Sequence, residues 1–191
     1  MIKMIPDNEF ITIKGIPGPT KEEIRCLVMC KSSVSSEDTV VDIGCGTGGL
    51  TVEFAKRSKK VYAVDKNKMA LTLTLKNLEK QGLENKVELI ADDGFEALKN
   101  IDNIDILMIG GSGGNLSSIL KEGFKKLNNG GRILVSSILL ETPVEAIKTL
   151  NELKMDPEVI NVSVSKGRMI NRGTMMLSNN PITIITAKKE M

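Results

Sequence analysis

The chain has 191 residues, of which 41% are hydrophobic and 26% are charged, and this balance is typical of a globular protein rather than a disordered or fibrous one. A net charge of +2 argues against a nucleic-acid partner, because phosphate binding is usually driven by a strongly basic balance. The chain has no histidine, which excludes Ser-His-Asp and Cys-His catalysis and any metal site built on imidazole.

The length indicates one domain, 1–191, since domains usually contain about 100–200 residues. We expect residues 1–37 to form an N-terminal loop and helix, and residues 38–188 to form a Rossmann-like core. The chain shows no export signal and no run that is long and apolar enough to span a bilayer. These features predict a cytoplasmic protein without a membrane partner.

The three cysteines, Cys26, Cys30 and Cys45, form neither an even set nor a pair with metal-ligand spacing. We therefore expect no disulfide and no metal. Cys26 and Cys30 share one face of a predicted helix, which favours a place in the core.

Strands and helices alternate from residue 38 onward, after a loop at IPGPT and an amphipathic helix that starts near Thr20. Short β-branched runs alternate with amphipathic stretches, as in the βαβ units of a parallel sheet. The predicted strands are TVVDI, VYAVD, VELIA, IDILMIG (104–110) and GGRILVSSIL (130–139). The predicted helices lie near 49–57, 67–81, 114–127 and 143–154.

The pattern changes from about residue 157, where EVINVSVS and PITIITAK are strand-like and the stretch 166–180 joins them. We expect these two segments to form an antiparallel C-terminal hairpin that closes the sheet. The predicted fold class is α/β, with a mostly parallel seven-stranded sheet and helices on both faces.

A glycine-rich turn connects an apolar strand to a helix at VVDIGCGTGG, residues 40–49. Glycines lack Cβ atoms, so the backbone can approach a nucleoside closely, and the following helix offers free N–H groups. The turn also satisfies GxGxxG, so both S-adenosyl-L-methionine and NAD are candidate ligands. The candidate contacts are Gly44, Cys45, Gly46, Thr47 and Gly48.

Three carboxylates near the ends of successive predicted strands bear on the choice of cofactor. Asp65 can accept hydrogen bonds from both hydroxyls of a ribose, and it fits either cofactor. Asp42 precedes the glycines, in reach of a methionine ammonium, whereas a carboxylate there would repel a pyrophosphate. Asp93 is placed to bind the adenine edge. The set favours the cationic S-adenosyl-L-methionine, although any one carboxylate alone could simply cap a turn.

The segment IGGSGGN, residues 109–115, follows the fourth predicted strand, where ligands bind in open α/β sheets. Gly111, Ser112 and Gly113 are candidates for binding a bulky or anionic substrate. A tight turn that caps the next helix is the alternative.

A cluster of cations, Lys166, Arg168 and Arg172, lies in the predicted loop KGRMINRGTMM. These side chains are candidates for holding substrate carboxylates over the cofactor cleft. A solvated turn or a subunit contact accounts for them equally well.

Segments across nearly the whole chain resemble a family of cobalamin-pathway methyltransferases that act on cobalt-precorrin-6B at carbon 15 with loss of carbon dioxide. The glycine motif is common to all class I methyltransferases, whereas PGPT, GGSGG and NRGTMM are far more restrictive. The matching segments are MIPDNEF, IPGPTKEEIRCLVM, VVDIGCGTGG, VYAVD, IGGSGGNL, GGRILVSSILLET and GRMINRGTMMLSNNP.

The resemblance implies a class I methyltransferase fold, the cofactor S-adenosyl-L-methionine and a cobalt-precorrin tetrapyrrole as substrate. It places cofactor contacts at Thr20, Gly44 to Gly48, Asp65 and Gly94, with Asp93 beside the adenine. Gly94 stands where relatives often have Ala, an exchange that should preserve a backbone contact. The family also implies a homotetramer, with the C-terminal hairpin as a candidate contact, and no catalytic side chain is indicated.

Three alternatives stay open on the sequence alone: a class I methyltransferase acting on RNA or another small molecule, an NAD-dependent oxidoreductase, and a ligand-binding subunit without catalysis. RNA would require a basic face bearing aromatic residues, and the chain has only one Tyr and four Phe. An oxidoreductase would normally bring a separate substrate domain.

Overall fold

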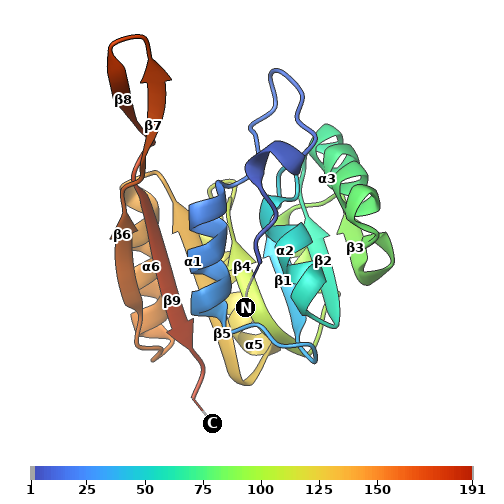
Figure 1. The fold of residues 1–191 in the computed structure, drawn as a ribbon. Helices are drawn as coiled ribbons and strands as arrows, with labels where there is room; N and C mark the ends of the chain where they lie inside the picture. The colour runs from blue at the N-terminus through green and yellow to red at the C-terminus, as the bar shows by residue number, and fades with distance from the viewer. Residues whose placement is uncertain (1–2, 191) are drawn as a thin grey trace.

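A computed structural model describes residues 3–190, and its centre is one seven-stranded sheet in the order β3-β2-β1-β4-β5-β9-β6 (Figure 1). Neighbouring strands from β3 to β5 are parallel, and β9 runs antiparallel to both β5 and β6. The predicted mostly parallel sheet is confirmed. Its strands are β1 (Thr39–Ile43), β2 (Lys60–Val64), β3 (Val87–Ile90), β4 (Ile104–Ile109), β5 (Leu127–Ser137), β6 (Glu158–Val162) and β9 (Ile182–Lys188).

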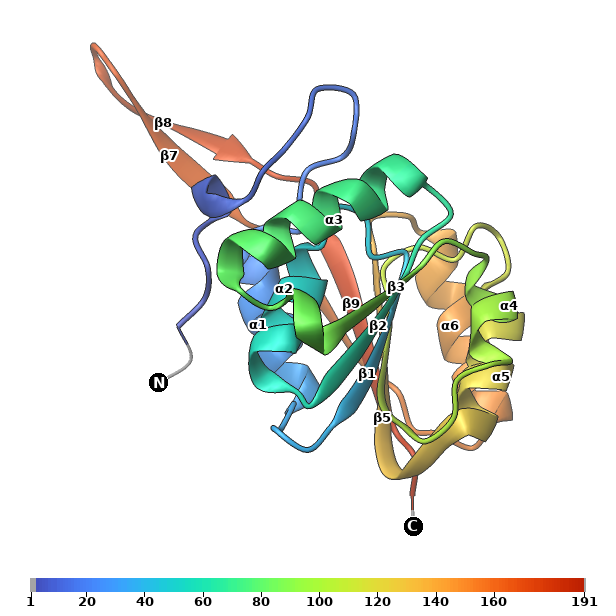
Figure 2. The same cartoon turned by 90° about the vertical axis from the view of Figure 1, so that its right-hand side faces the viewer.

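Helices cover both faces of the sheet, as predicted. Figure 2 shows α1, α2 and α3 on one face and α4, α5 and α6 on the other. The helices are α1 (Glu22–Ser32), α2 (Gly49–Arg57), α3 (Lys68–Gln81), α4 (Gly94–Leu98), α5 (Leu116–Lys126) and α6 (Glu141–Glu152).

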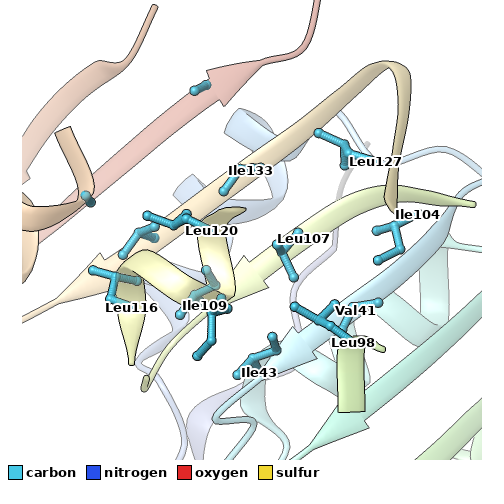
Figure 3. Packing of buried hydrophobic residues seen from close by; sticks show 14 of the residues in the cluster. Val41, Ile43, Leu98, Ile104, Leu107, Ile109, Leu116, Leu120, Leu127 and Ile133 are labelled. Atoms are coloured by element: carbon cyan, nitrogen blue, oxygen red, sulfur yellow. The ribbon is translucent and has the colours of Figure 1, made fainter. Parts of the chain in front are cut away.

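The core lies between the sheet and these two helical layers, and the central strands are buried on both faces. Such strands read as continuous β-branched runs because neither face meets water. On the α4–α6 side, Val41 and Ile43 of β1 pack with Leu107 of β4 and with the helical residues Leu98 and Leu116 (Figure 3). The alternate residues of β1 face the α1–α3 side, since strand side chains point to opposite faces in turn.

The sequence pattern did not indicate α4, which contains only five residues. A helix this short has no recognisable period of apolar residues. The expected core position of Cys26 and Cys30 is wrong, because both are exposed. The buried face of α1 instead carries Ile24, Val28 and Met29.

The C-terminal part of the chain contains one more pair of strands than predicted. The two strand-like segments form β6 and β9, which pair with each other and close the sheet, as expected. The stretch between them is not a loop: it forms the antiparallel hairpin of β7 (Ser165–Ile170) and β8 (Gly173–Ser178), a separate two-stranded sheet. Figure 1 shows this hairpin projecting beyond the end of β9 and β6.

The N-terminal segment, residues 4–20, precedes α1 and contains a short 3-10 turn at Asp7–Glu9. The Asp7 carboxylate accepts a hydrogen bond of 2.9 Å from the N–H of Glu22, so this segment caps the first turn of α1. In the described part of the chain, no helix has the length and apolarity required to cross a membrane.

Candidate functional site

A cavity of ≈ 270 Å³ opens at the carboxyl ends of β1, β2, β3 and β4. Ligands in open α/β sheets bind at this edge because the connecting loops diverge there and leave a crevice. The lining residues are Ile43, Gly44, Val64, Asp65, Lys66, Asp92, Asp93, Gly94, Gly111, Ser112 and Gly113.

The turn after β1 depends on a glycine at position 44. Gly44 has a φ of 71°, in the left-handed region, and its N–H donates to the carbonyl oxygen of Val64 over 2.8 Å. A Cβ atom on Gly44 would lie 2.6 Å from the backbone nitrogen of Gly111. The turns after β1 and β4 therefore come together only because this residue has no side chain.

Asp65 follows β2 and lines the same cavity. Its two carboxylate oxygens accept hydrogen bonds from the N–H of Gly46 at 2.9 Å and from the N–H of Asn67 at 2.8 Å. These bonds hold the carboxylate beside the glycine-rich turn. Each oxygen retains a free lone pair for a hydroxyl donor.

Asp93 caps the N-terminus of α4, where its carboxylate accepts a 2.8 Å hydrogen bond from the N–H of Phe95. Its other oxygen lies 2.7 Å from the ammonium of Lys66. The hydrogen bond to Lys66 is the main cause that holds the pKa of Asp93 below its usual value. Sequence reasoning missed Lys66 and Asp92 as lining residues, although both stand next to residues that it selected.

Asp42 lies away from the cavity. Its side chain is buried on the α1–α3 side of β1, where it accepts a 2.6 Å hydrogen bond from the hydroxyl of Thr51. Burial raises its pKa to about 6, while the bond from Thr51 acts in the opposite direction. Successive side chains of a strand point to opposite faces, so the Asp42 carboxylate lies on the face of β1 opposite to Val41 and Ile43.

Residues 46–48 of the turn contact α3, and of these Gly46 also bonds to Asp65 in the cavity wall. Thr74 donates from its hydroxyl to the carbonyl oxygen of Gly46 over 2.8 Å. Thr20 lies against the start of α2, since a Cβ on Gly49 would come within 3.0 Å of the Thr20 nitrogen. The predicted cofactor contacts outside the cavity lining are Thr20, Asp42, Cys45, Gly46, Thr47 and Gly48.

The cation cluster also lies outside the lining of this cavity. Lys166 pairs with the Glu23 carboxylate of α1 at 2.7 Å, and this bond raises the pKa of the Lys166 ammonium. Arg168 and Arg172 are exposed on the β7–β8 hairpin. Among residues 3–190, no group of three or more Asp, Glu or Cys side chains gathers in a way that could hold a metal ion.

Comparison with known proteins assigns the family. The profile of the precorrin methyltransferase domain matches residues 18–189. A probable cobalt-precorrin-6B C(15)-methyltransferase (decarboxylating) of Methanobrevibacter smithii is 52% identical over 97% of this chain and 100% of its own length. The protein of the same description from Methanothermobacter thermautotrophicus is 48% identical, over 95% of each chain.

Two solved structures agree in fold over almost the whole chain. The precorrin 8W decarboxylase of Methanobacterium thermoautotrophicum has a TM-score of 0.94 at 47% identity, covering 96% of this chain and 99% of that one. The precorrin-6y C5,15-methyltransferase of Geobacter metallireducens has a TM-score of 0.90 at 29% identity, covering 99% and 100%. With its fold, its glycine-rich turn and these relatives, the chain belongs to the precorrin methyltransferase domain family.

Proposed function

We propose that the cavity binds S-adenosyl-L-methionine. The observation that carries this proposal is the charge of the lining: Asp65, Asp92 and Asp93 face one lysine, Lys66, which itself pairs with Asp93. An anionic cavity favours a ligand that carries a sulfonium and an ammonium, and it repels the pyrophosphate of NAD. When bound, S-adenosyl-L-methionine supplies a methyl group attached to a positively charged sulfur.

The residues present suit such a ligand. We assign the ribose hydroxyls to Asp65 and the adenine edge to Asp93 with the backbone of Gly94. The turn from Gly44 to Gly48 offers backbone without bulky side chains, and a Cβ at position 44 would collide with the opposite loop. Thr20 and Asp42 stay predicted contacts, which would require a ligand that extends past the lining of the cavity.

We further propose that the substrate is cobalt-precorrin-6B, methylated at carbon 15 with loss of carbon dioxide from the ring-C acetate, as a step of cobalamin biosynthesis. The support is the description of relatives that are 52% and 48% identical over nearly complete chains. Methyl transfer is an in-line displacement, so the protein mainly has to align a nucleophilic carbon with the methyl group. The conjugated macrocycle can itself accept the electrons that decarboxylation releases, and no catalytic side chain is assigned.

The substrate carries several carboxylates, and we propose Arg168 and Arg172 as their partners, with Gly111, Ser112 and Gly113 at the cavity. Lys166 would have to exchange Glu23 for a substrate carboxylate, which makes it the weaker candidate of the three. Steady-state kinetics on Arg168→Ala and Arg172→Ala should show a raised KM for the tetrapyrrole with an unchanged affinity for S-adenosylhomocysteine. An unchanged KM in both variants would remove these residues from the substrate site.

The cofactor assignment is tested by calorimetric titration with S-adenosyl-L-methionine, S-adenosylhomocysteine and NAD. We expect both sulfur nucleosides to bind, and Asp65→Ala to weaken them by roughly 10- to 100-fold because two hydroxyl bonds to a charged acceptor are lost. Asp156→Ala is the matched control, since Asp156 is an exposed carboxylate that precedes β6 at the opposite edge of the sheet. Binding of NAD alone would overturn the proposal.

A homotetramer is our proposal for the assembly, supported by the exposed apolar residues of the β7–β8 hairpin.

A cytoplasmic location and the absence of a nucleic-acid partner stay predictions from the sequence. Fluorescence anisotropy with a labelled RNA at low salt tests the second of these, and binding there would favour the alternative RNA methyltransferase.

A further inference from the structure

The N-terminal segment is anchored to the protein by buried polar side chains from the α1–α3 layer. The N–H of Ile5 donates to the Glu53 carboxylate of α2 over 2.9 Å. The Arg25 guanidinium donates to the carbonyl oxygens of Ile5 and Thr20, near the two ends of the segment. Arg25 and Glu53 are fully buried. The ends of the segment are therefore fixed independently of the cavity.

Two residues of α3 hold the middle of the segment: Lys80 donates to the carbonyl oxygen of Glu9 over 2.6 Å at the surface, and Asn77 binds Ile11 from a buried position. The Asn77 side-chain oxygen accepts a 2.7 Å hydrogen bond from the N–H of Ile11, and its amide nitrogen donates to the carbonyl oxygen of Ile11 over 3.2 Å. The same nitrogen donates to the carbonyl oxygen of Thr47 over 2.9 Å. Asn77 is 2% exposed, so water cannot replace these partners easily.

Thr47 belongs to the glycine-rich turn, and a second α3 side chain holds the neighbouring residue of that turn. The Thr74 hydroxyl donates to the carbonyl oxygen of Gly46, and the N–H of Gly46 in turn donates to Asp65 in the cavity wall. The turn thus lies between α3 on one side and the cavity on the other. A shift of the turn would therefore move the carbonyl oxygen of Thr47, to which the Asn77 amide donates.

We propose that Asn77 is a positioning residue that couples the N-terminal segment to the cofactor-binding turn. Ligand in the cavity fixes the turn, the turn fixes the Asn77 amide through Thr47, and the amide fixes the segment through both backbone groups of Ile11. Coupling of this kind is reciprocal: a well-anchored segment must raise cofactor affinity by the same factor by which the cofactor stabilises the segment. The inference rests on the proposed cofactor.

The sharpest test changes only the segment. Ile11→Pro deletes the N–H that donates to Asn77, and Phe10 already has the extended backbone that precedes a proline, with φ of −83° and ψ of 137°. Ile11 is exposed and does not line the cavity. We expect calorimetry to show a dissociation constant for S-adenosylhomocysteine raised by about 3- to 10-fold, the scale of one neutral hydrogen bond.

The second test uses Asn77→Ala and trypsin. Lys14 lies exposed in the segment, so cleavage after it reports how often the segment opens. In the wild-type protein, saturating S-adenosylhomocysteine should slow this cleavage several-fold. In Asn77→Ala the protection should disappear even at a concentration that saturates the variant, because the ligand and the segment no longer share a partner.

Two control variants separate coupling from a loss of stability. Glu79→Ala alters an exposed side chain of α3 close to Asn77 in the helix. Thr149→Ala alters a buried polar residue of α6, on the opposite face of the sheet. Both should retain wild-type affinity and protection by the ligand.

The outcomes distinguish this inference from the proposed function. If the wild-type protein does not bind S-adenosylhomocysteine, the cofactor proposal fails. If it binds, but Ile11→Pro keeps wild-type affinity or Asn77→Ala keeps the ligand-dependent protection, the cofactor proposal stands and the coupling is wrong. Because Ile11→Pro leaves α3 intact, the proposal stays testable even if Asn77→Ala fails to fold.

Discussion

Asp42 is a buried carboxyl group behind the glycine-rich turn, and its environment sets its protonation. Only Thr51 donates a hydrogen bond to it among the described residues, and desolvation raises its pKa to about 6. Asp65 and Asp93, in contrast, lie at the cavity and receive backbone N–H bonds. Three carboxylates near the ends of adjacent strands thus play different parts, because burial and partners differ from one to the next.

Asp42→Asn should change how stability depends on pH. In the unfolded chain this carboxyl group loses its proton near pH 3.8, whereas in the folded protein it keeps the proton until about pH 6. Rising pH therefore favours unfolding of the wild-type protein between these values. Relative to Asp42→Asn, the wild-type free energy of unfolding should fall by roughly 2 kcal/mol between pH 4 and pH 6, at about 1.4 kcal/mol per pKa unit over the part of the titration in this range.

Urea unfolding of both proteins across this pH range measures the difference. If the free energies of unfolding of the two proteins run parallel across this range, the folded protein does not raise the pKa of Asp42.

At the scale of elements, the site is built from turns that follow β1 and β4. Gly44 allows these turns to touch, and the N–H of Gly110 donates to the carbonyl oxygen of Ile43 over 2.8 Å. The strand, the closely spaced glycines and the helix follow one another in the sequence, so the local pattern predicts the turn after β1. The partner of Gly44 lies far along the chain, so no local pattern predicts the contact.

Gly44→Ala and Gly82→Ala separate backbone strain from steric collision. Gly82 ends α3 with a φ of 65°, and a Cβ there meets no atom within 4 Å. Gly82→Ala should cost about 1 kcal/mol from the left-handed conformation alone. Gly44→Ala carries the same strain and also the collision with Gly111, so we expect about 2–4 kcal/mol and a loss of S-adenosylhomocysteine binding.

Urea denaturation and calorimetry of the two variants give both quantities. If both variants lose the same free energy of unfolding and Gly44→Ala still binds S-adenosylhomocysteine, the turns after β1 and β4 can move apart without loss of stability or binding.

At the scale of the whole molecule, the β7–β8 hairpin stands apart, because it is a separate two-stranded sheet outside the seven-stranded one. All residues of both strands are exposed, including Met169 at 78% and Met176 at 60%. Exposed apolar side chains gathered on one projecting element are typical of a protein interface. One ion pair, between Lys166 and Glu23, connects the hairpin to α1.

Replacing Met169 and Met176 together by Lys should dissociate the proposed tetramer without unfolding the chain, because neither side chain packs in the core. Light scattering after size exclusion should show a lower mass for this variant, while its unfolding still proceeds in one cooperative transition. Met69→Lys alters an exposed methionine of α3 and serves as the control. A mass unchanged by the double substitution would exclude the hairpin as a required contact.

Much of the fold followed from the sequence, because runs of β-branched residues and amphipathic stretches are local signals. The order of alternation predicted the parallel strands, and the positions after strand ends identified Gly44, Asp65, Asp93 and Gly111, all of which line the cavity. Segments that resemble the precorrin family predicted the family to which the chain belongs.

Other features were decided only by tertiary structure, because they depend on which face or which distant residue a side chain meets. Strand alternation directs Asp42 away from the cavity, and helix packing leaves Cys26 exposed. Lys66 reaches Asp93 across two strand ends, and Asn77 joins segments that lie 66 and 30 residues away in the chain. Local sequence specifies the elements, whereas contacts between distant residues arise when the sheet and its helices pack.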